Sequence, residues 1–224
     1  MTTTRFKSQW KQDEFLNMGI FRGKKDGFFV DIGAHDGVDG SNSYFFEKEL
    51  GWKGICIEPI TERYVQLIQN RDCFCMNCCV YDKVDMVPFT QNSGYTEMLS
   101  GITNTYDSRH IERIVREQKT EGGNSRMVRK PTYPLNNILE LHNVREVDYL
   151  SIDTEGSEYS ILFAIDFNKY VIKTISVENN YPDDFERIDK LLTEKGFSRI
   201  IRLGGDEIYI NTKVFTIKLN TPSP

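Results

Sequence analysis

The stretch that decides the fold is Phe28-Phe29-Val30-Asp31-Ile32-Gly33-Ala34-His35-Asp36-Gly37, an apolar run that leads directly into a turn punctuated by glycine. Phenylalanine, valine and isoleucine are typical of a buried β-strand. Gly33 and Gly37 allow the backbone to turn tightly and to approach a bound ligand closely. A glycine loop also occurs as a simple turn, so its interpretation depends on the rest of the chain.

Short apolar runs alternate with helical patterns along most of the sequence. We expect strands at residues 28–32, 54–57, 73–80, 147–152 and 171–177. We expect helices at residues 43–50, 61–70, 135–142, 158–167 and 183–195. Strands that alternate with helices form a mostly parallel, doubly wound sheet covered on both faces. The sequence therefore predicts a Rossmann-like α/β fold.

Two regions depart from this alternation. The runs 197–203 and 207–210 are separated only by Gly204-Gly205-Asp206, which is too short for a crossover helix and predicts an antiparallel edge hairpin. Between residues 92 and 130 the pattern is lost, apart from one helix expected at 106–119. Such an insertion is a candidate lid or substrate loop. We expect residues 1–224 to form a single domain.

Composition excludes several classes of protein. The formal charge is −5, from 33 acidic and 28 basic side chains, so nucleic acid is not the expected partner. No apolar run approaches the roughly 18 residues of a membrane span, and the N-terminus shows no secretory leader. Five cysteines crowded between residues 56 and 79 indicate free thiols in a reducing compartment. We therefore expect a cytoplasmic protein.

An acidic residue, Glu58, follows Gly37 by 21 positions, at the end of the second expected strand. A carboxylate there can accept hydrogen bonds from both hydroxyl groups of a ribose, which predicts a nucleoside ligand. The loop acids Asp31, Asp36 and Asp39 would repel the phosphates of a dinucleotide. S-Adenosylmethionine carries a sulfonium and an ammonium group but no phosphate, so it fits this loop better.

Four segments at strand ends are informative together. They are Val30 to Gly37, Ile57-Glu58-Pro59, Asp148-Tyr149-Leu150-Ser151-Ile152-Asp153-Thr154-Glu155-Gly156 and Ser176-Val177-Glu178-Asn179. As a set they resemble the FkbM-type methyltransferases of the class I S-adenosylmethionine-dependent fold, over nearly the whole chain. The resemblance implies a seven-stranded sheet with strand order 3-2-1-4-5-7-6 and O-methylation of hydroxyl groups on sugars or natural products.

The sequence is also similar to the methyltransferase domain of large algal-virus enzymes that build glycans. This second resemblance implies a deoxysugar such as rhamnose as the acceptor. It also implies a place within a larger glycosyltransferase polypeptide and, for a viral protein, the cytoplasm of the host.

The family resemblance assigns cofactor contacts residue by residue. Those it places around the methionine half of the cofactor are Asp31, Gly33, His35 and Gly37. Those it places at the methionine carboxylate are Ser41 and Asn42. Those it places near the ribose and the adenine are Glu58, Ile60, Cys78 and Cys79.

Acidic residues end the fourth and fifth expected strands, namely Asp153 and the pair Glu178-Asn179. Parallel strands share one carboxyl edge, so these side chains are expected in one crevice, with Asp153 also contacting the cofactor. Their oxygens suit Mg²⁺, and the pattern resembles the Asp plus Asp-Asn triad of catechol-type O-methyltransferases. Glu178 departs from the usual Asp, which leaves metal dependence open. Glu155 is the expected general base, and a charge at a helix start is the alternative.

Other interpretations stay open. An NAD-dependent sugar oxidoreductase or epimerase would use the same sheet, although the Gly-x-Gly turn is missing. A methyltransferase-like module could bind a glycan without turnover. His110 is expected to be solvated, with a role as base or substrate ligand as the alternative. The thiols of Cys73-x-Cys75-x-x-Cys78-Cys79 alternate along a strand, which favours small core residues over a zinc site.

Overall fold

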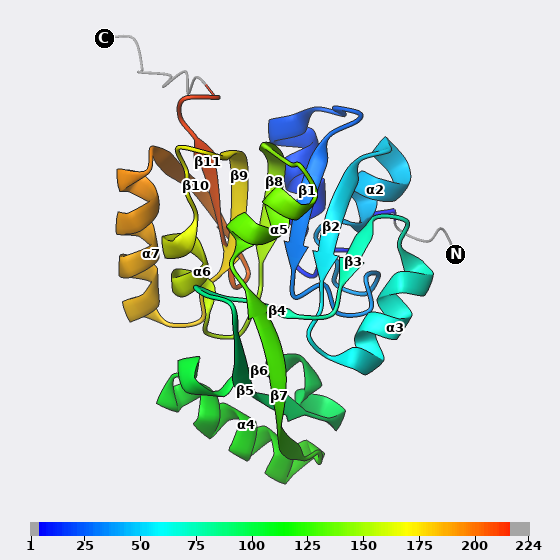
Figure 1. The fold of residues 1–224 in the computed structure, drawn as a ribbon, viewed down its shortest axis with the longest axis vertical. Coiled ribbons are helices and arrows are strands. Elements are labelled where there is room, and N and C mark those ends of the chain that lie inside the picture. Colours follow the sequence, from blue (N-terminus) through cyan, green and yellow to red (C-terminus); the bar gives the residue numbers. More distant parts are fainter. Residues whose placement is uncertain (1–4, 216–224) are drawn as a thin grey trace.

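A seven-stranded sheet forms the centre of the protein (Figure 1). The fold is that of a computed structural model, which describes residues 5–215. The strands of the central sheet are β1 (Phe28–Ile32), β2 (Lys53–Ile57), β3 (Phe74–Met76), β8 (Glu146–Ile152), β9 (Val171–Glu178), β10 (Phe197–Leu203) and β11 (Asp206–Asn211). Their order is β10-β11-β9-β8-β1-β2-β3. Read from β3 and numbered within this sheet, this is the order 3-2-1-4-5-7-6, as expected.

The last two strands form the predicted antiparallel hairpin. β11 pairs antiparallel with β10 on one side and with β9 on the other. The pairs β1–β2, β1–β8, β2–β3 and β8–β9 are all parallel. The hairpin turns at Gly204, which has a φ of +60° that glycine adopts readily. The mostly parallel sheet with an antiparallel edge is therefore confirmed.

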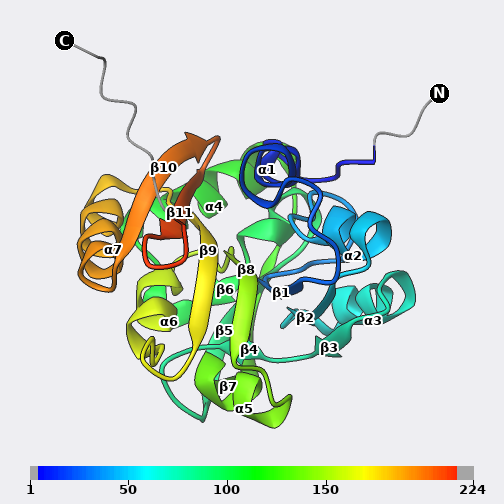
Figure 2. The same ribbon diagram turned by 90° about the horizontal axis from the view of Figure 1, so that it is seen from above.

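Helices cover both faces of the central sheet (Figure 2). They are α1 (Gln12–Phe15), α2 (Tyr44–Leu50) and α3 (Thr61–Asn70) on one face and α5 (Leu135–Leu141), α6 (Glu158–Ala164) and α7 (Pro182–Glu194) on the other. A π-helical segment, Leu16–Phe21, continues α1. Because β1 is buried on both sides, its alternating side chains serve two cores: Phe29 packs with Phe46 of α2, whereas Val30 packs with Ile138 of α5.

The expected third strand is wrong in its second half. β3 joins the central sheet, but β4 (Cys79–Val80) leaves it and pairs with β7 (Ser125–Tyr133) of a second sheet. The chain separates at Asn77, whose side-chain amide donates hydrogen bonds to the backbone carbonyls of Glu58 (2.8 Å) and Pro59 (3.1 Å). An apolar run thus divides between two sheets because a polar residue within it bonds back to the end of β2.

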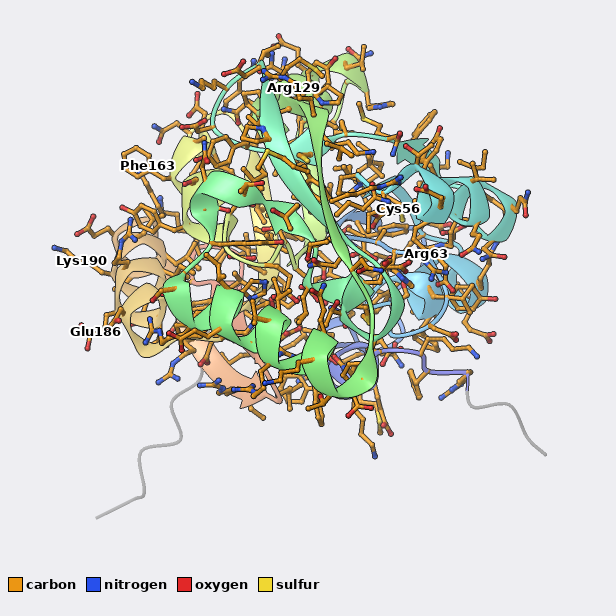
Figure 3. The ribbon with its side chains drawn as sticks, turned by 90° about the horizontal axis from the view of Figure 1, so that it is seen from below. Cys56, Arg63, Arg129, Phe163, Glu186 and Lys190 are labelled. Atoms are coloured by element: carbon orange, nitrogen blue, oxygen red, sulfur yellow. The ribbon has the colours of Figure 1, made fainter. Side chains whose placement is uncertain are left out.

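The second sheet has four strands in the order β4-β7-β5-β6, with β5 at Asp85–Asn92 and β6 at Gly101–Ile102. Two 3₁₀ turns, Gly94–Leu99 and Thr103–Thr105, flank β6. The helix expected at 106–119 is α4 (Ser108–Glu121). Figure 1 shows the second sheet and α4 below the central sheet, and Figure 3 shows α4 crossing in front of it. Within residues 5–215, no helix has the length and apolarity to span a membrane.

Candidate functional site

A cavity of about 980 Å³, counted with the space at its open mouth, lies between the central sheet and the second sheet. Strand ends and the turns after them supply one wall, which includes Gly33, His35, Glu58, Ile60, Cys78, Cys79, Asp153, Glu155 and Glu178. The segment that builds the second sheet and α4 supplies the other wall, which includes Phe89, Glu97, Leu99, Ile102 and Arg113. Carboxyl ends of parallel strands are the usual ligand site of such sheets.

The turn after β1 is held tightly against two neighbouring strands. The N–H of Gly33 donates to the carbonyl of Ile57 at 2.9 Å. Gly33 has a φ of +88°, and any side chain there would overlap with the carbonyl oxygen of Asp153. His35 also has a positive φ, +50°, which directs its backbone N–H to the Oε2 of Glu58 at 2.8 Å. The loop therefore joins the ends of β1, β2 and β8 into one wall.

Glu58 is buried at the end of β2 and is held by two backbone donors. Its Oε1 accepts from the N–H of Ile60 at 2.6 Å, and its Oε2 accepts from the N–H of His35. Burial raises the pKa of Glu58 to about 7, although these two hydrogen bonds favour the ionised form. A carboxylate fixed in this way keeps lone pairs for hydroxyl groups of a ligand in the cavity.

One end of the cavity is apolar. Ile60, Cys79, Phe89 and Ile102 form a buried cluster there, and Cys78 lies beside them. Burial raises the pKa of the Cys78 thiol to about 12 and raises that of Cys79 further, so both thiols stay neutral. This region suits a flat apolar group such as a purine ring.

The other end of the cavity is acidic. One carboxylate oxygen from each of Asp153, Glu155 and Glu178 lies within 4.8 Å of those of the other two. Burial raises the pKa of all three carboxyls well above their usual values, and each is raised further by the charge of a neighbouring acid in the group. Three acids at this spacing can hold a proton or bind a cation.

Glu158 has a different role from these three acids. Its Oε1 accepts hydrogen bonds from the backbone N–H and the hydroxyl of Thr154, and its Oε2 accepts from the N–H of Gly156. Glu158 begins α6, so it caps the loop between β8 and that helix.

Several residues predicted to hold the cofactor do not line the cavity. Asp31 accepts a hydrogen bond from the hydroxyl of Ser43 at 2.5 Å, and Ser41 accepts one from Arg71 at 3.2 Å. Asn42 donates to the hydroxyl of Ser151 at 3.0 Å. These contacts form a buried polar network on the far side of the loop. Gly37 packs against Leu67 and Arg71 of the same region.

Asn179 also stands apart from the main cavity. It lines a smaller neighbouring cavity together with Glu155 and Glu178. Its side chain is buried, and neither its oxygen nor its nitrogen has a hydrogen-bond partner among residues 5–215. The predicted metal triad is therefore only partly gathered at the main cavity, where Asp153 and Glu178 meet Glu155.

Three residues of the insertion lie at the site, and the sequence indicated only His110 among them, as an alternative. Arg113 of α4 lines the cavity, and Glu97 contacts both His35 and Arg63. The expectation that His110 is solvated is wrong, because it is 2% exposed and its Nδ1 lies 3.5 Å from the Oε2 of Glu155. No local signal separates these residues from the other charged residues of the insertion, since their positions depend on how the second sheet docks.

The model of the Methyltransferase FkbM domain matches residues 31–199, about three quarters of the sequence. No curated protein sequence matches the chain. A crystal structure of methyltransferase FkbM from Methylobacillus flagellatus KT is similar, with 13% identity and a TM-score of 0.49, over 84% of this chain and 44% of that one. Precorrin-6y C5,15-methyltransferase from Geobacter metallireducens GS-15 shares 11% identity, with a TM-score of 0.42, over 94% and 90% of the two chains.

The family match fixes the class of protein. The chain belongs to the FkbM methyltransferase domain family, as the strand-end segments of the sequence indicate. It spans less than half the length of the Methylobacillus protein.

Proposed function

We propose that this protein transfers the methyl group of S-adenosylmethionine to a hydroxyl group of a sugar, and that a deoxysugar such as rhamnose is the acceptor. The observation that carries the proposal is a single cavity with Glu58 in its wall and the group of Asp153, Glu155 and Glu178 at its acidic end. Such a cavity attracts a cationic nucleoside and disfavours one that carries phosphates. Membership of the FkbM family supports methyl transfer.

The residues along the cavity fit this cofactor. Glu58 would accept hydrogen bonds from the ribose hydroxyl groups, and Ile60 and the Cys78–Cys79 pair would pack against the adenine. The backbone at Gly33 would lie against the methionine half, since only glycine fits between β1 and Asp153. The bound cofactor supplies an electrophilic methyl group on a sulfonium.

The acidic end of the cavity supplies the base. A sugar hydroxyl is a poor nucleophile at neutral pH, so a positioned acceptor for its proton assists the transfer by about 10²- to 10⁴-fold. We assign this role to Glu155, which is buried and lines the cavity. Asp153 and Glu178 would orient the sugar through its hydroxyl groups.

The same acids suit Mg²⁺ as an additional cofactor. Asp153 and Glu178 offer hard oxygen ligands close together, and the buried side-chain oxygen of Asn179 has no hydrogen-bond partner among the described residues. We propose that these three residues hold the ion when it binds. A bound Mg²⁺ would orient the acceptor oxygen and favour its ionised form.

Thermal unfolding with S-adenosylmethionine, S-adenosylhomocysteine and NAD tests the cofactor assignment. A ligand at about 100 times its dissociation constant adds about 2.7 kcal/mol to the native state, which is a measurable shift of the midpoint. We expect both sulfur nucleosides to stabilise the protein and NAD to have no effect. Repeating the series with Mg²⁺ and with a chelator tests the ion. Stabilisation by NAD alone would contradict the proposal and favour a sugar oxidoreductase.

A further inference from the structure

His110 of α4 is buried against the proposed base. Its Nδ1 lies 3.5 Å from the Oε2 of Glu155, and its Nε2 lies 3.2 Å from the backbone carbonyl of Leu99. The ring also packs on Tyr106, with 4.5 Å between the ring centroids. The imidazole is thus held on both edges and on one face, and one of its two nitrogens is directed at Glu155.

The two nitrogen contacts determine how protons are placed. A backbone carbonyl only accepts hydrogen bonds, so the Nε2 of His110 carries a hydrogen and donates it to Leu99. The other nitrogen, Nδ1, therefore faces the carboxyl of Glu155 either as a donor to its ionised form or as an acceptor from its protonated form. In both cases Nδ1 lies 3.5 Å from the Oε2 of Glu155, close enough to favour one orientation of the carboxyl.

Glu155 depends on such contacts because its own backbone is in an unfavourable conformation. Its φ is +59°, in the left-handed region that residues other than glycine rarely adopt. A second contact comes from Asn180, whose amide donates to the same Oε2 at 3.5 Å. Both contacts fall on Oε2, which leaves Oε1 for a ligand in the cavity that Glu155 lines.

Helix α4 belongs to the insertion and not to the central sheet, and it crosses the carboxyl edge of that sheet (Figure 3). One turn after His110 the same helix places Arg113 in the cavity wall. We propose that His110 is a positioning residue that holds Glu155 in the orientation in which it accepts the hydroxyl proton of the sugar, so that the insertion completes the catalytic site. This inference rests on the proposed function of Glu155.

Two substitutions distinguish the contacts that the two nitrogens of His110 make. In His110→Asn the side-chain amide stands near the place of Nδ1 and can still contact Glu155. In His110→Gln the amide stands near the place of Nε2 and can still bond to Leu99, but the contact with Glu155 is lost. We expect the kcat of His110→Gln to fall by about 10- to 100-fold, with an unchanged KM for S-adenosylmethionine. His110→Asn should retain most of the wild-type kcat. Equal losses in both variants would overturn the proposal, because they would indicate a purely structural role.

A double variant tests whether His110 acts through Glu155. With S-adenosylmethionine and methyl rhamnoside as probes, His110→Gln should cause no further loss of kcat in a Glu155→Gln background. Losses that multiply would overturn the inference. The matched control is His142→Gln, since His142 lies beside Phe74, away from the cavity, and should leave kcat unchanged.

A spectroscopic readout keeps this inference separate from the proposed function. Long-range ¹H–¹⁵N spectra of the imidazole should show a hydrogen on Nε2 of His110 and an Nδ1 signal that moves in Glu155→Gln. An unmoved Nδ1 signal would overturn the inference even if the wild type transfers methyl groups. Absence of transfer by the wild type, with the Nδ1 signal shifted, would instead overturn the sugar acceptor and leave the His110–Glu155 contact supported.

Discussion

Gly33 lies so close to Asp153 that a Cβ on residue 33 would overlap with the backbone carbonyl oxygen of Asp153. The N–H of Asp153 in turn donates to the carbonyl of Ile32 at 3.0 Å. The glycine turn after β1 and the acid after β8 are therefore one unit. A change in the turn displaces the acid that the proposed reaction needs.

Gly33→Ala should lower the free energy of unfolding by about 2 to 4 kcal/mol, because it combines a backbone clash with a φ of +88°. The matched control is Gly40→Ala. Gly40 has a φ of +73° but no atom near the position of a Cβ. Gly40→Ala should therefore lower the free energy of unfolding by only about 1 kcal/mol. Urea unfolding of both variants measures the difference. Equal losses would show that the contact with Asp153 is not tight.

Glu58→Gln should remove part of the pH dependence of stability. The pKa of Glu58 is raised from 4.5 to about 7 by burial, so the native state binds its proton more tightly than the unfolded chain does. This stabilisation is complete below about pH 4.5 and is lost as the pH rises to about 7. Between pH 5 and pH 8 the free energy of unfolding of the wild type should fall by up to about 3 kcal/mol more than that of Glu58→Gln.

The other buried acids are present in both proteins, so they cancel in this comparison. Urea unfolding at several pH values gives the two curves. A constant difference between them from pH 5 to pH 8 is the outcome that rules out a raised pKa for Glu58. The variant should also bind S-adenosylmethionine more weakly, since an amide accepts hydrogen bonds from the ribose less well than a carboxylate does.

Asp153→Asn should abolish transfer without lowering the melting temperature. Burial and the nearby charge of Glu178 raise the pKa of Asp153, so replacing this acid removes a repulsion that costs stability. Loss of the carboxylate that orients the sugar should reduce kcat by about 100-fold or more. Asp39→Asn, in the exposed part of the loop, serves as the matched control. Full activity in Asp153→Asn would refute the role given to this residue.

Glu97→Gln should speed the release of the cofactor. The Oε1 of Glu97 contacts the Nε of Arg63 in α3 and lies 3.2 Å from the Nε2 of His35, so Glu97 joins the insertion to the elements of the central sheet beside the cavity. An amide weakens both contacts, and a loss of about 1 kcal/mol corresponds to about a fivefold faster release. Stopped-flow displacement measures the rate. Glu140→Gln, which weakens the pair with Lys169 outside the insertion and away from the cavity, should release the cofactor at the wild-type rate.

The middle of the central sheet could be predicted from sequence because β1, β2, β8 and β9 are largely apolar runs buried on both faces. The second sheet could not, because β7 carries Arg126, Arg129 and Lys130 on a partly exposed surface. β7 is recognised only by its pairing with β5, which is antiparallel over eight residue pairs. The break at Asn77 was missed for a similar reason, since its side chain bonds to a distant strand end.

The residues of the candidate site that follow strands of the central sheet could be predicted from sequence, and those in the insertion could not. Asp153, Glu178 and Glu58 follow apolar strands, so their positions at one edge of the sheet follow from the order of the strands. His110 and Glu97 lie in the insertion, and nothing in their immediate sequence indicates what they contact. Their positions become known only once β4 has paired with β7 and the second sheet has docked on the first.

Transfer of an isotope-labelled methyl group tests the central claim most directly. The wild type is incubated with S-adenosylmethionine carrying a ¹³C methyl group and with a panel of methyl glycosides that includes rhamnoside, and the product is examined by ¹³C NMR. We expect an O-methyl signal on the deoxysugar, which Asp153→Asn does not produce and Asp39→Asn does. Labelled methyl on no sugar of the panel, although S-adenosylmethionine stabilises the protein, would contradict the sugar hydroxyl as acceptor.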